Sequence, residues 1–278
     1  FIHHSCTIFV KGCNILCGNP PIPCRDSRIR VKQVFRRIKK QKKKMPCIIN
    51  IETSTKVCSA AVTIDGTVAL QKVSYEGPSH ASLLGGYVKD LMQFLKDNHI
   101  TPEAVAVSSG PGSYTGLRIG VSMAKGLCFG MEIPLISVTT TELMTVGVMF
   151  DDTVPEEALL CPMIDARRME VYTSIYDRAL NEILPLGAYI IGEESFKEIL
   201  EKHKVVFFGD GSEKCKNVIK HPNAMFLPDI VPLASNMLPL SERAFRSGTF
   251  QDVAYFQPEY IKEFQATIPK NKVINPGL

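Results

Sequence analysis

The stretch SSGPGSYTGLRIGVSMAKGL, residues 108–127, carries the main structural signal of this chain. It starts at the end of an apolar strand, turns through residues 110–112 and continues with helical periodicity. The turn is typical of phosphate-binding loops, but the stretch has no lysine at the position that a P-loop requires. Gly116 and Gly120 lie inside the predicted helix, where each costs about 0.5–1 kcal/mol relative to alanine. Such a cost predicts close packing along one face of the helix.

Gly116, Gly120 and Ala124 are spaced at i, i+4 and i+8, and therefore share one helix face. The helix predicted at 79–98 repeats the pattern in two pairs of small residues: Ala81 with Gly85, and Ser82 with Gly86. On spacing alone two explanations are open, namely packing of each helix on its own sheet and close approach of a helix from another protein. Because two neighbouring helices share the feature, we expect an intermolecular interface. A Gly120→Leu substitution should then prevent complex formation and leave the isolated fold mostly intact.

The hydrophobic pattern after Met45 predicts the element order β-β-β-α-β-α twice. The first copy has predicted strands at 47–52, 57–64, 67–74 and 104–109, and helices at 79–99 and after the 110–112 turn. The second has predicted strands at 159–165, 169–176, 182–190 and 204–209, and helices at 193–203 and after the 209–211 turn. We therefore predict an α/β protein with an N-terminal lobe at 45–150 and a C-terminal lobe at 151–278. Two such lobes meeting at a cleft resemble the actin, sugar kinase and Hsp70 (ASKHA) superfamily.

Residues 1–44 differ in composition from the rest. They hold 12 Lys/Arg and one Asp, so the remaining residues carry a net charge of −7 although the whole chain is +4. A basic arm for RNA is one interpretation, and a metal site using the His and Cys residues is another, although no C-x2-C pair supports it. We favour a third, in which the segment is a non-native or disordered extension translated from a start site set too early.

The composition of the whole chain, 45% hydrophobic and 22% charged, is typical of a soluble globular protein. No apolar run reaches the roughly 18–20 residues that a membrane span needs, so we expect no membrane association. Five cysteines after residue 44 are scattered through apolar segments. They predict buried thiols in a reducing cytoplasm.

In the ASKHA superfamily, the turn after the first strand of each lobe holds nucleotide phosphates. The corresponding turns here are Glu52-Thr53-Ser54-Thr55-Lys56, which has no glycine, and Asp165-Ala166-Arg167-Arg168, which has two arginines. We therefore expect a degenerate nucleotide site formed by Glu52, Ser54, Thr55, Asp165, Gly209 and Gly211. We expect no bound cofactor, while weak or vestigial nucleotide binding stays open.

Catalytic and metal-ligating patterns are not evident. No two histidines after residue 44 are spaced at i, i+3 or i, i+4, the spacing that places two ligands on one helix face. No spacing indicates a nucleophile with its base. We expect neither a catalytic residue nor a metal site.

Three segments closely resemble the TsaB (YeaZ) family, bacterial partners of the enzyme that makes threonylcarbamoyladenosine in tRNA. These are IINIETSTKVCSAAV (48–62), the 108–127 stretch and MIDARRMEVYTSIY (163–176). The resemblance runs from about Met45 to Tyr260. It implies a non-catalytic subunit that docks onto a TsaD-like catalytic subunit, with a TsaE-like ATPase in the assembly and tRNA reached indirectly. A homodimer in isolation is also compatible with it.

The resemblance also implies where the docking surface lies and what the chain lacks. TsaD holds its metal with a His-x-x-x-His pair, whereas this chain has His80 and then Leu84. Family members commonly begin the first turn with Asp, where this chain has Glu52. By motif position the partner-binding residues are Ser82, Gly86, Ser113, Tyr114, Gly116, Arg118, Gly120 and Ala124. The alternatives are a stand-alone ASKHA-type ATP-binding enzyme or metallopeptidase-like protein, and direct tRNA binding through the basic arm.

Overall fold

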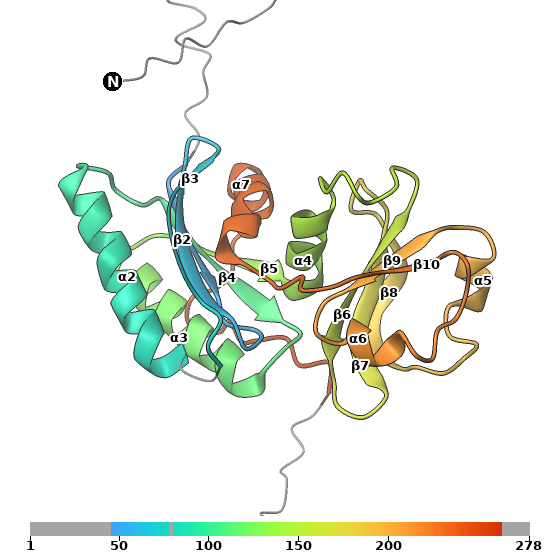
Figure 1. The fold of residues 1–278 in the computed structure, drawn as a ribbon. Coiled ribbons are helices and arrows are strands. Elements are labelled where there is room, and N and C mark those ends of the chain that lie inside the picture. The colour runs from blue at the N-terminus through green and yellow to red at the C-terminus, as the bar shows by residue number, and fades with distance from the viewer. Residues whose placement is uncertain (1–45, 78–79, 263–278) are drawn as a thin grey trace, which may run out of the picture. The chain divides into compact units, whose positions relative to one another are not determined.

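The computed structural model describes residues 46–77 and 80–262. The first 44 residues lie outside the described residues, as do the predictions made for them. The described chain contains two mixed five-stranded sheets (Figure 1). This arrangement confirms the predicted α/β fold with two lobes.

The first sheet has the strand order β3-β2-β1-β4-β5. Its strands are β1 (Ile48–Glu52), β2 (Cys58–Ile64), β3 (Thr67–Ser74), β4 (Ala104–Gly110) and β5 (Leu135–Thr139). β1 pairs antiparallel with β2 and parallel with β4. Asp65 and Gly66 connect β2 to β3 with positive φ values of 49° and 75°, as a two-residue hairpin turn requires. β1 and β4 are buried along their whole length, because helices cover both faces of the sheet.

Two pairs of helices cover the two faces of this sheet (Figure 1). α2 (His80–Asp97) and α3 (Tyr114–Met131) cover one face, where their apolar side chains form a core with Ile49 and Ile51. α4 (Thr140–Val148) and α7 (Leu238–Ser247) lie on the other face, in a core with Ile48. Alternate residues of β1 therefore belong to different cores, as the period of two in a strand dictates.

The second sheet has the strand order β10-β9-β6-β7-β8. Its strands are β6 (Leu159–Asp165), β7 (Glu170–Tyr176), β8 (Glu182–Ile190), β9 (Val205–Phe208) and β10 (Ala224–Leu227). Two short helices belong to this lobe, α5 (Lys197–Leu200) and α6 (Ser212–Cys215), whereas the later 3-10 helix η1 (Ala234–Met237) packs on the first sheet. The second copy of the predicted element order is therefore present, but its helices are single turns.

The helix predicted at 193–203 is reduced to α5 because Phe196 leaves the helical conformation, with φ of +61°. Its ring packs 6.3 Å from that of Tyr189 and 5.8 Å from that of Phe207, measured between ring centroids. Packing of this half-buried ring against the second core holds the backbone in a conformation that a helix does not allow.

The C-terminal end of the chain does not stay with the second sheet. α7 packs on β1 and β5, and Val253 and Phe256 pack against the core under α2 and α3. The predicted boundary, which assigned all of 151–278 to the C-terminal lobe, is therefore wrong for these segments. The sequence did carry a signal for α7: Pro239 in its first turn and Gly248 after its end, with φ of +71°.

The segment that leads from α4 to β6 is held by Arg178. Its guanidinium donates hydrogen bonds to the carbonyl oxygens of Met149, Val154 (2.8 Å) and Pro155 (3.1 Å). α4 itself packs on β6, so it contacts both sheets. One arginine of the second lobe thus fixes the connection between the lobes.

The five cysteines outside the N-terminal segment are buried free thiols, as predicted. Burial raises the pKa of Cys58 and Cys128 to about 11 and that of Cys161 to about 12. Among the helices of residues 46–77 and 80–262, none combines the length and apolar character that a membrane span requires.

Candidate functional site: a helical groove and an adjacent cleft

α3 begins at the turn that the 108–127 stretch predicted. Ser113 is the N-cap residue, and its hydroxyl accepts a hydrogen bond from the Gly116 amide at 3.2 Å. The Ser113 amide donates to the carbonyl oxygen of Ser54 at 2.6 Å, which ties the start of α3 to the turn after β1. Ser113, predicted to bind a partner, therefore has a structural role as a cap.

The stripe of Gly116, Gly120 and Ala124 is buried against the chain's own first sheet. A Cβ atom on Gly116 would overlap the carbonyl oxygen of Thr53, and one on Gly120 would overlap the Thr53 hydroxyl oxygen. The expectation that these three residues face a foreign backbone is wrong, because Thr53, just after β1, fills the space beside Gly116 and Gly120, and Ala124 is buried in the core of the first lobe. The first of the two explanations left open by spacing, self-packing, holds for this stripe.

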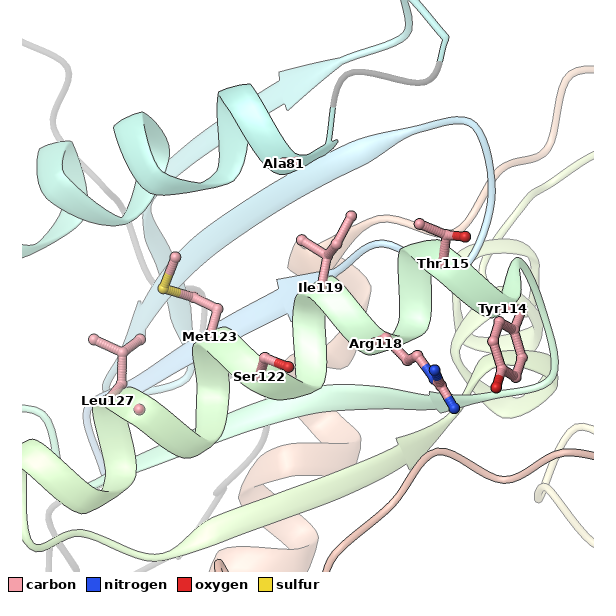
Figure 2. A pocket seen from close by; sticks show the side chains of 9 residues that line it. Ala81, Tyr114, Thr115, Arg118, Ile119, Ser122, Met123 and Leu127 are labelled. Atoms are coloured by element: carbon pink, nitrogen blue, oxygen red, sulfur yellow. The ribbon is translucent and has the colours of Figure 1, made fainter.

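A different face of α3 borders an open groove of about 740 Å³ between α2 and α3. Figure 2 shows Ile119, Met123 and Leu127 pointing from α3 toward the α2 side. The lining residues are mainly apolar or small: Ala81, Tyr114, Thr115, Arg118, Ile119, Ser122, Met123, Gly126 and Leu127. An apolar groove open to solvent is typical of a site for a helix of a partner protein.

The small residues predicted on α2 do not line this groove. Ser82 and Gly86 are exposed, with open space where a Cβ atom on Gly86 would lie, but Ala81 is the α2 residue among the lining residues. On α3, Gly126 lines the groove and also has open space at its Cβ position. Ser122 and Gly126, four residues apart, form a second small stripe on α3 that the sequence analysis missed. Arg118, four residues before Ser122, is the signal that could have marked this face as the exposed one. Whether Ser82 and Gly86 contact a partner stays a prediction.

Tyr114, Arg118 and Tyr260 form one cluster at the N-terminal end of the groove. The Arg118 guanidinium carbon lies 4.0 Å from the centroid of the Tyr114 ring, and the two tyrosine rings are 4.8 Å apart. Arg118 Nε donates to the Tyr260 hydroxyl at 3.1 Å. This hydrogen bond raises the pKa of Arg118, which is a cation at every physiological pH. Figure 2 shows Arg118 and Tyr114 side by side.

Tyr260 belongs to a C-terminal segment that is fixed to the first lobe at several points. Lys125 Nζ donates to the carbonyl oxygens of Ala254 and Phe256, each at 3.0 Å. The Glu259 amide donates to the carbonyl oxygen of Ser109 at 2.7 Å. A residue far from α3 in sequence is thereby brought against it.

A larger cleft of about 1010 Å³ lies beside the groove. Of the six residues predicted for a degenerate nucleotide site, Ser54, Thr55 and Asp165 line it. The others, Glu52, Gly209 and Gly211, are not among its lining residues. The six residues therefore do not form one site.

Glu52 is fully buried behind the turn. Its Oε1 atom accepts a hydrogen bond from the Ser54 amide, and its Oε2 atom has no hydrogen-bond partner among the described residues. Burial raises the pKa of Glu52 above its ordinary value, and hydrogen bonds from Ser54 only partly oppose this. The carboxyl group is therefore not exposed to the cleft.

Internal packing explains why positions 209 and 211 are both glycine. A Cβ atom on Gly209, whose φ is +98°, would overlap the carbonyl oxygen of Met163, and one on Gly211 would lie 2.9 Å from the carbonyl carbon of Ile164. The strand β6 packs directly against both glycines, and neither of them lines the cleft. Whether the cleft binds a nucleotide stays a prediction.

The cleft has a basic rim instead. Lys56, Arg167 and Arg168 line it, and none of the three forms an ion pair within the described part of the chain. Arg167 and Arg168 are held at φ of +69° and +51°, a conformation that costs a non-glycine residue roughly 1–2 kcal/mol. The neighbouring Asp165 is neutralised by Lys214. Cations at this rim favour contact with an anion.

The two positions that correspond to the His-x-x-x-His pair of TsaD, His80 and Leu84, are also not arranged to bind a metal. His80 is buried and its Nε2 atom lies 2.7 Å from the carbonyl oxygen of Thr55, while Leu84 belongs to the core. Within residues 46–77 and 80–262 no group of three or more His, Cys, Asp or Glu side chains is placed to hold a metal ion.

Comparisons with known proteins agree with this description. The family model described as "TsaD: tRNA N6-adenosine threonylcarbamoyltransferase" matches residues 76–270. The chain is 30% identical to the tRNA threonylcarbamoyladenosine biosynthesis protein TsaB of Escherichia coli K12, covering 77% of this chain and 94% of that protein. The Bacillus subtilis TsaB is 29% identical, with 79% and 95% covered. In structure, YeaZ from Pseudomonas aeruginosa has a TM-score of 0.65 at 24% identity, with 78% and 100% covered.

Two five-stranded sheets, both contacted by α4, define a two-lobed protein of ASKHA-like fold, and the family model places it among TsaD-type proteins. Within that group, the chain belongs to the TsaB (YeaZ) family.

Proposed function

We propose that this chain is a non-catalytic subunit in tRNA threonylcarbamoyladenosine biosynthesis. It docks onto a TsaD-type protein through the groove between α2 and α3 and supports that protein's activity. The observation that carries the proposal is the open, mainly apolar groove, in a chain whose curated relatives are named TsaB biosynthesis proteins. Docking would stabilise the active conformation of the partner, a shift of population rather than a chemical step.

The non-catalytic part of the proposal is supported by the replaced residues. Leu84 lies in the core where the resemblance expects a metal ligand, and Glu52 is buried away from the cleft. A phosphate group in the cleft would meet Lys56, Arg167 and Arg168, so weak nucleotide binding through these cations is part of the proposal. A TsaE-like ATPase joins the assembly, tRNA is reached through the complex, and the protein acts in the cytoplasm.

The test is a Gly126→Leu substitution. Gly126 lines the groove and has open space around it, so leucine fills the groove without disturbing the core. Co-elution with a TsaD-type protein should be lost, while the thermal unfolding midpoint should not fall, because leucine favours a helix more than glycine does. As a matched control, Gly248→Asn changes a glycine at the end of α7, away from the groove, and should co-elute normally. Unchanged co-elution of Gly126→Leu would disprove docking through this groove.

Other occupants and activities are outcomes of the same assay. A second copy of this chain in the groove would give a homodimer that the TsaD-type protein displaces. ATP turnover or metal-dependent peptide cleavage by the purified chain alone would favour the stand-alone enzyme instead.

A further inference from the structure

One charged side chain occurs among the nine residues that line the groove. Arg118 lies at the end of the groove nearest the start of α3, and the remaining lining residues are apolar, small or uncharged. Within residues 46–77 and 80–262 Arg118 forms no ion pair, and its guanidinium donates a hydrogen bond to the Tyr260 hydroxyl. A segment that docks in this apolar groove should therefore place a negative charge opposite the single cation.

The guanidinium is held in place before any partner arrives. It stacks on the Tyr114 ring at 4.0 Å, and its Nε atom is fixed by the Tyr260 hydroxyl at 3.1 Å. A stacked and hydrogen-bonded arginine loses less side-chain entropy on binding than a free one, and its fork fits a carboxylate with two parallel hydrogen bonds. Tyr260 supplies this fixation from the C-terminal segment, which Lys125 anchors to α3.

We propose that the groove receives a helix of the partner protein that carries a carboxylate side chain opposite Arg118, and that Tyr260 positions the Arg118 guanidinium for it. This inference rests on the docking function proposed above and names the chemistry of the docked helix. Ile119, Met123 and Leu127 bury the apolar face of that helix, and Gly126 allows its backbone to approach. The carboxylate then sets its register along the groove.

A protein helix fits these residues better than nucleic acid does. A phosphodiester backbone has no apolar face to cover Ile119, Met123 and Leu127, and the part of the chain after residue 44 carries a net charge of −7. An exposed apolar groove with one cation at its rim is instead matched by an amphipathic helix with one acidic residue.

The experiment measures the affinity of the full chain for a purified TsaD-type protein at 50 mM and 500 mM salt. Arg118→Glu should weaken binding by about 30-fold or more at low salt, and this effect should shrink at high salt because ions screen the charge at the rim. Arg118→Lys keeps the charge without the fork and should lose only about 3- to 10-fold. Tyr260→Phe removes the hydroxyl that fixes Nε, and a loss of about 3-fold is expected for a positioning residue.

Two controls separate this inference from the docking function. Lys220→Glu makes the same charge reversal at an exposed site of the second lobe and should bind normally. Arg118 is exposed, so each variant should keep the wild-type thermal midpoint.

If Gly126→Leu abolishes binding while Arg118→Glu binds within two-fold of wild type, the carboxylate inference is overturned and docking survives. If both variants bind like wild type, the docking function itself fails. Rescue of Arg118→Glu by an acid-to-lysine change in the partner helix would establish the pair.

Discussion

The hydroxyl of Thr53 donates a hydrogen bond of 2.8 Å to the carbonyl oxygen of Gly116. It joins the end of β1 to the first turn of α3 and fixes how α3 is rotated about its axis. With this contact in place, Gly116 and Gly120 face inward and Gly126 faces solvent. α3 thus has two rows of small residues. One is buried and packs on the first sheet, and the other is exposed and lines the groove.

Two glycine substitutions on α3 should therefore have opposite effects on stability. Gly120→Ala should lower the free energy of unfolding by about 1–3 kcal/mol, because the new Cβ overlaps the Thr53 hydroxyl. Gly126→Ala should raise it by about 0.5–1 kcal/mol, because alanine favours a helix and meets no atom there. Urea unfolding of both variants measures the difference. Gly120→Leu, expected from sequence to spare the fold, should instead unfold it. Equal effects of the two alanine variants would refute this account of α3.

Glu52→Gln should stabilise the protein in a pH-dependent manner. Since the pKa of Glu52 is raised in the folded state, its contribution to stability is fully present below its unfolded pKa of about 4.5 and is lost as pH rises through the folded value. A neutral amide removes this loss, so the variant should be more stable than wild type at pH 7.5 by on the order of 1 kcal/mol. The advantage should decline toward pH 5. Denaturant unfolding at both pH values tests this, and a pH-independent difference would show that Glu52 does not titrate.

Arg167 and Arg168 should lower the stability of the fold and at the same time bind an anion in the cleft. Replacing the pair by Asn-Gly suits the two positive φ values and should raise the free energy of unfolding by about 1 kcal/mol. The same change removes two cations from the cleft, so any ATP or inorganic phosphate binding seen by calorimetry should be lost. Replacing Lys216 and Lys220, exposed cations of the same lobe, by Asn and Gly is the matched charge control. A less stable double variant at 167–168 would contradict the strain argument.

Arg178 should be a major stabilising residue for the connection between the lobes. Arg178→Ala leaves the carbonyl oxygens of Met149, Val154 and Pro155 without their donor. It should lower the free energy of unfolding by about 1.5–3 kcal/mol. Limited proteolysis should then cut within 149–158 faster than in wild type. Lys204→Ala breaks an exposed ion pair with Glu157 and should change stability by less than about 0.5 kcal/mol. Similar losses in both variants would show that Arg178 has no special role.

The elements that sequence predicted best are those whose signal is local. The Asp65-Gly66 hairpin and the strand at 159–165 follow from turn chemistry and apolar runs, and both occur as expected. The helix predicted at 193–203 failed because the burial of Phe196 against Phe207, which sets its backbone, is a long-range contact. Tyr260 could not be placed beside Arg118 from sequence, since 142 residues separate them.

The amino-acid sequence by itself determined the α/β class, the two repeated element orders and, through the 108–127 stretch, the family. Local periodicity, turn residues and long specific motifs are sufficient for those conclusions. Only the tertiary structure decided which face of α3 is exposed. Two small stripes have the same four-residue spacing, and the rotation of a helix about its axis depends on its neighbours, here Thr53 on β1.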